Sequence, residues 1–180
     1  MLLDRDHSSL LVIDVQERLL PAIHDWQRLL DKVIWLVRLA GRLGVPVLAC
    51  EQYPKGLGPI HAALRAHLHD GVIAEKVHFS CVAAECLDGL IGGERRQMVV
   101  CGVEAHVCVL QTALELRAQG REVFAVADAV GSRDAREREL ALARMRGRGV
   151  EIVSGEMVAF EWLRRAATPE FRDISREFLR

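Results

Sequence analysis

The chain has 180 residues, and its 24 Lys and Arg residues nearly balance its 25 Asp and Glu residues, for a formal net charge of -1. This length suits one compact domain, residues 1–180, that buries a core without metals or disulfides. A near-neutral chain has no overall field that would concentrate nucleic acid or an anionic membrane. Small molecules and protein partners remain as the expected ligands.

The cysteines and the first residues of the chain indicate the cellular compartment in which the protein is expected. The five cysteines are an odd number and include no Cys-x-x-Cys pair, which favours reduced thiols and a cytoplasmic location. Met1 to Leu3 are followed at once by Asp4 and Arg5, unlike the basic start and long apolar stretch of a secretory signal. No apolar run approaches the ~20 residues that span a bilayer, so we expect no membrane segment.

Short apolar runs alternate along the chain with segments of helical period, which predicts strands joined by crossover helices in a parallel α/β sheet. In chain order, the first half should contain strand 10–14, helix 29–43, strand 45–50, a short helix near 60–69 and strand 72–76. The second half should contain a short helix 83–91, strand 97–101, helix 107–119, strand 122–128, helix 134–147, strand 150–153 and helices 155–165 and 169–178.

Three chemically useful side chains follow predicted strands. In an open parallel sheet the ligand site lies beyond the carboxyl ends of the strands, where the strand order reverses. Asp14 ends the first strand, Lys76 ends the third, and Cys108 follows the fourth, where a new helix begins. A helix N-terminus favours thiolate over thiol, so we expect the pKa of Cys108 to be lowered.

These three residues would form a hydrolytic set. Cys108 would attack an electrophilic carbon, Asp14 would take the thiol proton and return it to the leaving group, and Lys76 would hold negative charge nearby. Each residue also has a simpler interpretation. Cys108 could be a small buried hydrophobe, Asp14 a turn or cap residue, and Lys76 half of a solvated pair with Glu75.

Three blocks of the sequence resemble the isochorismatase-like cysteine hydrolases. They are Val12-Ile13-Asp14-Val15-Gln16, then Glu75-Lys76 with Phe79-Ser80, and finally Val100-Cys101-Gly102-Val103-Glu104-Ala105-His106-Val107-Cys108. The segment 51–58 is most similar to the isochorismatase domain-containing proteins, a subgroup of that family with no firmly established substrate.

The resemblance implies a three-layer, doubly wound sheet of six parallel strands in the order 3-2-1-4-5-6. It also implies a catalytic triad of Asp14, Lys76 and Cys108, and a cis peptide between Val103 and Glu104. The backbone amides of Glu104 and Cys108 would then form the oxyanion hole. A homo-oligomer, dimeric or higher, is expected as well.

The sequence departs from metal-bearing relatives, in which the second strand ends in an Asp-x-His pair that binds zinc. Here that stretch is Glu51-Gln52-Tyr53, which replaces imidazole by phenol, so we expect no metal and no other cofactor. His61, His67 and His69 lie nearby, on what we expect to be an exposed, solvated helix.

The expected substrate is a small molecule with an amide or ureido-like C–N bond, because relatives that cleave isochorismate itself usually lack the nucleophilic cysteine. The pocket should be lined by residues from the loops after the strands: Gln16, Leu19, Tyr53, Phe79 and His106. Glu104 could select a cationic or hydrogen-bond-donating substrate, or could be engaged in a structural or interface contact. Two rival interpretations remain: a catalytically silent protein that binds a metabolite or partner in the same cleft, and a redox role for Cys108.

Overall fold

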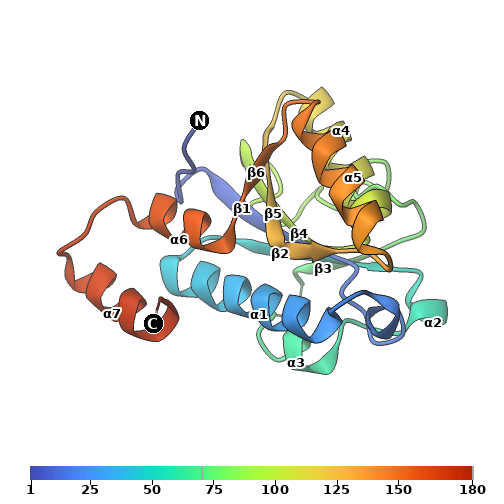
Figure 1. Ribbon diagram of the computed structural model, residues 1–180, viewed down its shortest axis with the longest axis horizontal. Helices are drawn as coiled ribbons and strands as arrows, with labels where there is room; N and C mark the ends of the chain where they lie inside the picture. Colours follow the sequence, from blue (N-terminus) through green and yellow to red (C-terminus); the bar gives the residue numbers. More distant parts are fainter. Residues whose placement is uncertain (70, 180) are drawn as a thin grey trace.

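Six parallel strands form one sheet in the order β3-β2-β1-β4-β5-β6 in the computed structural model, which describes residues 1–69 and 71–179 (Figure 1). This confirms the order that the resemblance implied. The strands are β1 (Ser8–Ile13), β2 (Val47–Gln52), β3 (Ile73–Lys76), β4 (Gln97–Val103), β5 (Glu122–Gly131) and β6 (Glu151–Val153). The strand order reverses between β1 and β4, so a ligand site is expected at their carboxyl ends.

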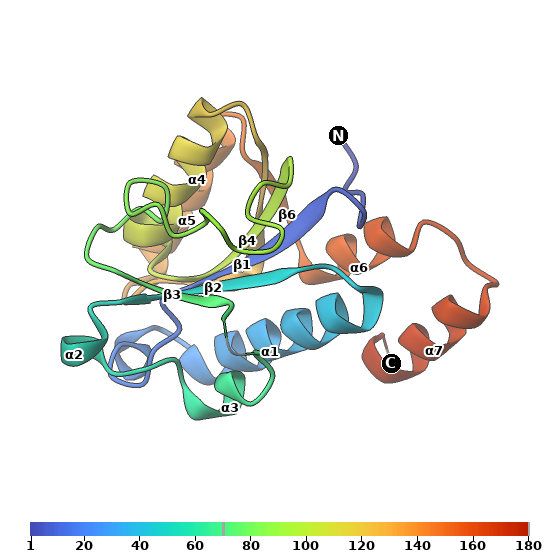
Figure 2. The ribbon, with the colours of Figure 1, turned by 180° about the vertical axis from the view of Figure 1, so that it is seen from behind.

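Helices cover both faces of the sheet (Figures 1 and 2). One face is covered by α1 (Trp26–Leu43) and α6 (Gly155–Leu163), with α3 (Ala62–Arg65) and α7 (Pro169–Phe178) packed against α1, and the other face is covered by α4 (Leu110–Ala118) and α5 (Ala135–Arg146). The short segments η1 (Leu20–Ala22), α2 (Pro54–Leu57) and η2 (Ala105–Val109) lie in the connections. Each sheet face therefore has its own apolar core, and β1 and β4 are buried along their whole length. No helix in the described part of the chain is long and apolar enough to cross a membrane.

Three predicted helices differ from the structure. The segment 83–91 forms turns rather than a helix, because Glu85 and Gly89 adopt positive φ angles of 55° and 76°, which an α-helix does not accommodate. The helix expected near 60–69 shortens to α3, which His61 caps by accepting a hydrogen bond from the Ala63 amide. The helix expected from residue 107 starts earlier, as the π-helical turn η2, before it continues as α4.

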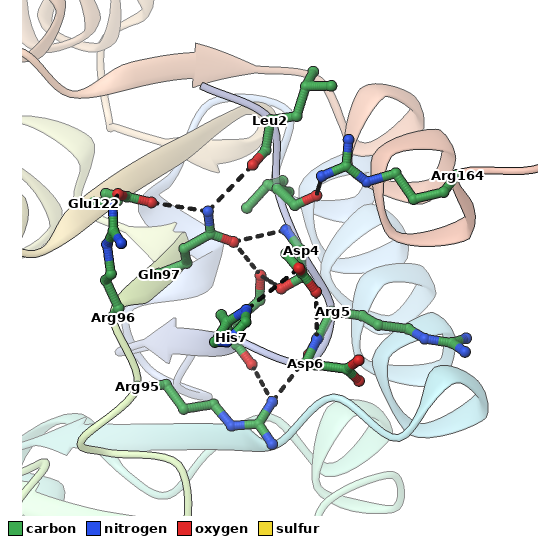
Figure 3. Close-up of polar contacts among 12 residues, drawn as sticks. Leu2, Asp4, Arg5, Asp6, His7, Arg95, Arg96, Gln97, Glu122 and Arg164 are labelled. Atoms are coloured by element: carbon green, nitrogen blue, oxygen red, sulfur yellow. Dashed lines mark hydrogen bonds and ion pairs between the residues drawn. The ribbon is translucent and has the colours of Figure 1, made fainter.

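The amino ends of the strands are tied together by Gln97 (Figure 3). Its Oε1 accepts hydrogen bonds from the Asp4 amide at 2.7 Å and the Ser8 hydroxyl at 3.0 Å. Its Nε2 donates to the Leu2 carbonyl at 3.2 Å and to the Glu122 carboxylate at 2.9 Å. The side chain is buried with all its polar atoms paired, as a buried amide requires. The polar groups at the amino ends of these strands are therefore paired with one another. The candidate functional groups lie at the carboxyl ends.

Candidate active site

Asp14, Lys76 and Cys108 lie at the carboxyl edge of the sheet, at or after the ends of β1, β3 and β4, with β2 between β1 and β3. Asp14 directly follows β1, Lys76 is the last residue of β3, and Cys108 lies in η2 after β4. Parallel pairing aligns these strand ends, with Gln52 of β2 opposite Lys76 and Gly102 of β4 opposite Ile13. The fold therefore brings together all three residues that the sequence singled out.

Asp14 and Lys76 form a buried ion pair. Lys76 Nζ donates to Asp14 Oδ2 at 2.7 Å, and both side chains are inaccessible to solvent. Asp14 adopts a left-handed backbone with φ of 54°, which Asp tolerates better than most residues. Burial acts to lower the pKa of Lys76, but the neighbouring Cys50, Asp14 and Cys108 raise it, and the net shift is upward. Lys76 therefore stays an ammonium and keeps a fixed positive charge in the site.

The Cys108 thiol is buried next to this ion pair and is only 6% exposed. Burial and the negative charge of Asp14 raise its pKa, and the opposing effect of Lys76 is smaller. This is the opposite of the lowered pKa expected for a thiol at a helix start. The physical reason is that desolvation and an adjacent carboxylate both disfavour thiolate. The resting site therefore holds a neutral thiol beside a charged pair.

Gly102 lets β4 run close enough to β1 to place Cys108 near Asp14. Its φ is 113°, and a Cβ atom there would lie 2.1 Å from the Ile13 carbonyl oxygen. The pairing of β4 with β5 shifts register between Val100 and Gly102. The next peptide, Val103–Glu104, is cis. Backbone geometry that only glycine permits thus leads directly into the turn that carries the thiol.

The Glu104 carboxylate is engaged by Arg133. Its Oε2 accepts hydrogen bonds from the Arg133 amide at 3.1 Å and from Arg133 Nε at 3.0 Å. Glu104 is 7% exposed, so this charge would be costly to bury without a partner. Of the two roles considered for Glu104, the structure shows the structural contact, which ties the end of β4 to the segment after β5.

The expected pocket residues fall into two groups. Tyr53 and Phe79, from the loops after β2 and β3, are 53% and 52% exposed, and Leu19 is half-buried. Gln16 is fully buried instead, and its amide bonds the backbone of Gln52 and Gly58. Gln16 therefore holds the loop after β2 in place. His106 is half-buried, with Nδ1 2.9 Å from Ser132 Oγ.

Two residues that the sequence did not single out contact the ion pair. Cys50 Sγ donates to Asp14 Oδ1 at 3.2 Å, and Lys76 Nζ donates to Gln52 Oε1 at 2.7 Å. Both lie on β2, two residues apart, at the edge where the candidate site was expected. Alternation of side chains along a strand predicts that both residues share one side of β2, but it does not indicate that this side meets the ion pair.

The two residues that replace the zinc ligands of metal-bearing relatives are Glu51 and Tyr53. Glu51 Oε1 accepts from the Ile60 amide at 2.7 Å, and Tyr53 is 53% exposed. Within residues 1–69 and 71–179, no group of three His, Cys, Asp or Glu side chains is arranged to hold a metal ion. Lys76 supplies the positive charge of the site.

The comparisons with known proteins agree with this architecture. A family model described as "Isochorismatase domain" matches residues 8–157. The chain is 35% identical to isochorismatase domain-containing protein 2A of Mus musculus over 95% of this chain and 82% of the relative. It is also 35% identical to the secreted isochorismatase effector Isc1 of Phytophthora sojae, over 94% and 84% of the two chains.

Solved structures share the fold over nearly the whole chain. The MAR1 ribonuclease of Caenorhabditis elegans superposes with a TM-score of 0.89 at 29% identity, covering 100% of this chain and 93% of that one. The YcaC gene product of Escherichia coli, described as an octameric hydrolase of unknown specificity, gives a TM-score of 0.87 at 23% identity and covers 99% and 96%. With its sheet order, its family match and these relatives, the chain belongs to the isochorismatase family and has that family's hydrolase fold.

Proposed function

We propose that this protein is a metal-independent cysteine hydrolase that cleaves an amide or ureido-like C–N bond of a small metabolite. Cys108 is the nucleophile, Asp14 the general base and acid, and Lys76 the fixed positive charge. The observation that carries the proposal is the solvent-free Asp14–Lys76 pair, 2.7 Å apart, beside the nearly buried Cys108 thiol. A buried charged pair beside a potential nucleophile is typical of active sites, where pKa values are tuned for proton transfer.

The raised pKa of Cys108 determines the order of proton transfer. The thiol enters the reaction protonated, and Asp14 accepts its proton as Sγ bonds to the substrate carbonyl carbon. The backbone amides of Glu104 and Cys108 would stabilise the negative charge that forms on the carbonyl oxygen. Lys76 pairs with Asp14 and keeps it oriented until that transfer.

The remaining steps return the enzyme to its starting state. Asp14 gives the proton to the leaving nitrogen as the C–N bond breaks, which leaves an acyl thioester on Cys108. Asp14 then takes a proton from water, and the resulting hydroxide attacks the thioester carbon. The C–S bond breaks, the proton returns to sulfur, and the acid product leaves. No step requires a metal, because Lys76 and the backbone amides supply the electrostatic stabilisation.

Tyr53 and Phe79 would contribute the outer wall of the substrate site. Both are half exposed on loops that adjoin the ion pair, so they can contact a ligand without rearranging the core. We further propose a homo-oligomer, for which an octameric relative of the same fold is a precedent. The chemistry needs a reduced Cys108, which a cytoplasmic location would maintain, although the Phytophthora relative is named as secreted.

A panel of small primary amides and ureides tests the proposal, with the acid product measured by mass spectrometry and the released ammonia by a coupled assay. We expect at least one to be hydrolysed, with turnover abolished in Cys108→Ala and retained after exhaustive chelation. Cys101→Ala is a matched control, because Cys101 is also a buried thiol but packs in the core on the α1 side of the sheet. Ligand binding without hydrolysis across the panel would instead support the catalytically silent alternative.

RNA hydrolysis is a second candidate, because the C. elegans structure with 29% identity carries the name of a ribonuclease. The net charge of -1 gives little attraction for a polyanion. Incubation with single-stranded and double-stranded RNA separates the two candidates. RNA cleavage that persists in Cys108→Ala would not use the thiol. It would indicate a thiol-independent RNA activity or a contaminant, and not the proposed cysteine hydrolysis.

A further inference from the structure

Strand β2 supplies one side chain that contacts Asp14 and another that contacts Lys76. Side chains two residues apart on a strand point to the same side, and Cys50 and Gln52 have this spacing. Cys50 Sγ lies 3.2 Å from Asp14 Oδ1, and Gln52 Oε1 lies 2.7 Å from Lys76 Nζ. Lys76 Nζ donates a hydrogen bond to the other carboxylate oxygen, Asp14 Oδ2. Both carboxylate oxygens of Asp14 therefore have a donor, and two of the three N–H groups of Lys76 have an acceptor.

The direction of the thiol hydrogen bonds follows from counting protons. A carboxylate can only accept, so Cys50 uses its single proton on Asp14 Oδ1. Cys81 Sγ lies 3.3 Å from Cys50 Sγ, and in that contact Cys81 must be the donor. The Cys81 backbone is fixed in turn, because its amide donates to the Thr112 hydroxyl at 3.0 Å. Cys81 therefore donates its proton to Cys50 Sγ, and Cys50 donates its own proton to Asp14.

Gln52 is held just as firmly. Its Nε2 donates to the Val77 carbonyl at 2.9 Å, which leaves Oε1 facing Lys76. Its backbone amide and carbonyl both bond the side chain of Gln16, at 2.8 and 3.0 Å. The acceptor for Lys76 is therefore fixed in place before any substrate binds, and it need not be ordered during the reaction.

We propose that Cys50 and Gln52 are positioning residues, which hold Asp14 and Lys76 in the arrangement that lets Asp14 receive the Cys108 proton. The inference rests on the proposed function. Without the Cys50 proton, the Asp14 carboxylate loses one of its hydrogen-bond donors. Its negative charge is then less stabilised and opposes ionisation of Cys108 more strongly. Without the Gln52 oxygen, Lys76 is free to move and stabilises a thiolate less. Both losses act in the same direction, toward a thiol that is harder to ionise.

Alkylation of Cys108 by iodoacetamide tests the inference without a known substrate. The rate is followed between pH 6 and 10 by peptide mass spectrometry, which separates Cys108 from the other thiols. The variants are Cys50→Ala, Cys50→Ser and Gln52→Met, with Cys101→Ala as the control for a buried thiol away from the site. Thermal unfolding verifies that each variant is folded.

Cys50→Ala and Gln52→Met should each slow alkylation of Cys108 at neutral pH about tenfold, as loss of one hydrogen bond to a charged group predicts. They should also shift the profile toward higher pH. Cys50→Ser keeps a donor and should stay close to wild type, as should Cys101→Ala. If the two residues had only a structural role, Cys50→Ala and Gln52→Met would lower stability without moving the pH profile of alkylation. Cys50→Ser would then have no profile shift to reverse.

Two results would overturn the inference, and they are distinguishable. If Cys50→Ala and Gln52→Met give the same profile as wild type while Asp14→Asn changes it, the two residues do not position the pair. If Asp14→Asn also leaves the profile unchanged, Asp14 does not interact with Cys108, and the proposed function fails together with the inference.

Discussion

Replacing Asp14 by Asn and replacing Lys76 by Met should move the pKa of the Cys108 thiol in opposite directions. Burial and the Asp14 carboxylate raise this pKa, whereas Lys76 lowers it. Asn removes the negative charge and leaves Lys76 in place, so a Cys108 thiolate becomes the counter-ion of the ammonium. Met removes the only one of these influences that favours thiolate.

The size of the effect follows from the closeness of the two groups, because the Asp14 charge is near enough to raise the pKa of Cys108. A charge within about 4–6 Å typically shifts a pKa by roughly 1–3 units. Coulomb's law agrees: at about 4 Å and an effective dielectric constant of about 20, a unit charge contributes about 4 kcal/mol. We therefore expect the alkylation midpoint of Cys108 to fall by about 1–3 pH units in Asp14→Asn and to rise in Lys76→Met.

The assay is the rate of iodoacetamide labelling at Cys108 across pH, measured for wild type and both variants. In wild type the rate should keep rising through the neutral range, because the thiol stays protonated there. Asp14→Asn should label faster than wild type at pH 7 and yet hydrolyse no substrate, because it has lost the base. If its midpoint stays unchanged or rises, the Asp14 charge does not hold the proton on Cys108, and the reasoning is refuted.

Four substitutions test the packing and ion pairing around the site. Lys76→Met should lower the free energy of unfolding by about 3–5 kcal/mol by leaving a buried carboxylate unpaired, and adding Asp14→Asn should recover most of the loss in urea titrations. Gly102→Ala should cost roughly 3–5 kcal/mol, because it adds a clash with backbone to an unfavourable φ, and thermal unfolding will measure it. Arg133→Ala should cost less than about 1 kcal/mol, because the guanidinium is largely exposed and the backbone amide of residue 133 still donates to Glu104. Glu104→Ala should cost about 1–2 kcal/mol, because a backbone amide loses its acceptor.

Matched controls separate these effects from general sensitivity. Lys32→Met breaks the partly exposed pair with Asp128, 3.2 Å apart, and should cost less than about 1 kcal/mol. Gly120→Ala has a φ of 83° but no atom within 4 Å of the added Cβ, so it should cost only about 1–2 kcal/mol. If these controls cost as much as Lys76→Met and Gly102→Ala, neither burial of the pair nor contact with Ile13 explains the losses.

The strands and the three central residues could be predicted from local patterns in the sequence, whereas the strand order followed from the family resemblance. Apolar runs mark buried strands, and Asp14 and Lys76 stand where those runs end. The segment 83–91 could not be predicted in this way. Its apolar spacing is helical, but backbone angles at Glu85 and Gly89 that depend on tertiary context interrupt it.

The electrostatics of the site were less predictable than its composition. Proximity to a helix start suggested a lowered pKa for Cys108, but the depth of burial and the position of Asp14 appear only in the folded chain and reverse the sign. Cys50 and Gln52 lie in an ordinary strand sequence, and only the three-dimensional pairing of β2 with β1 and β3 brings them to the ion pair. Glu104 likewise acquires its partner Arg133 from a distant segment.

The most direct test of the proposed chemistry is the mass of the enzyme during turnover. Wild-type protein is quenched with acid while it hydrolyses the best amide of the panel, and the Cys108 peptide is then examined for the acyl group. We expect an acyl thioester on Cys108, with neither adduct nor turnover in Cys108→Ala. Turnover that continues in Cys108→Ala would contradict the proposed chemistry.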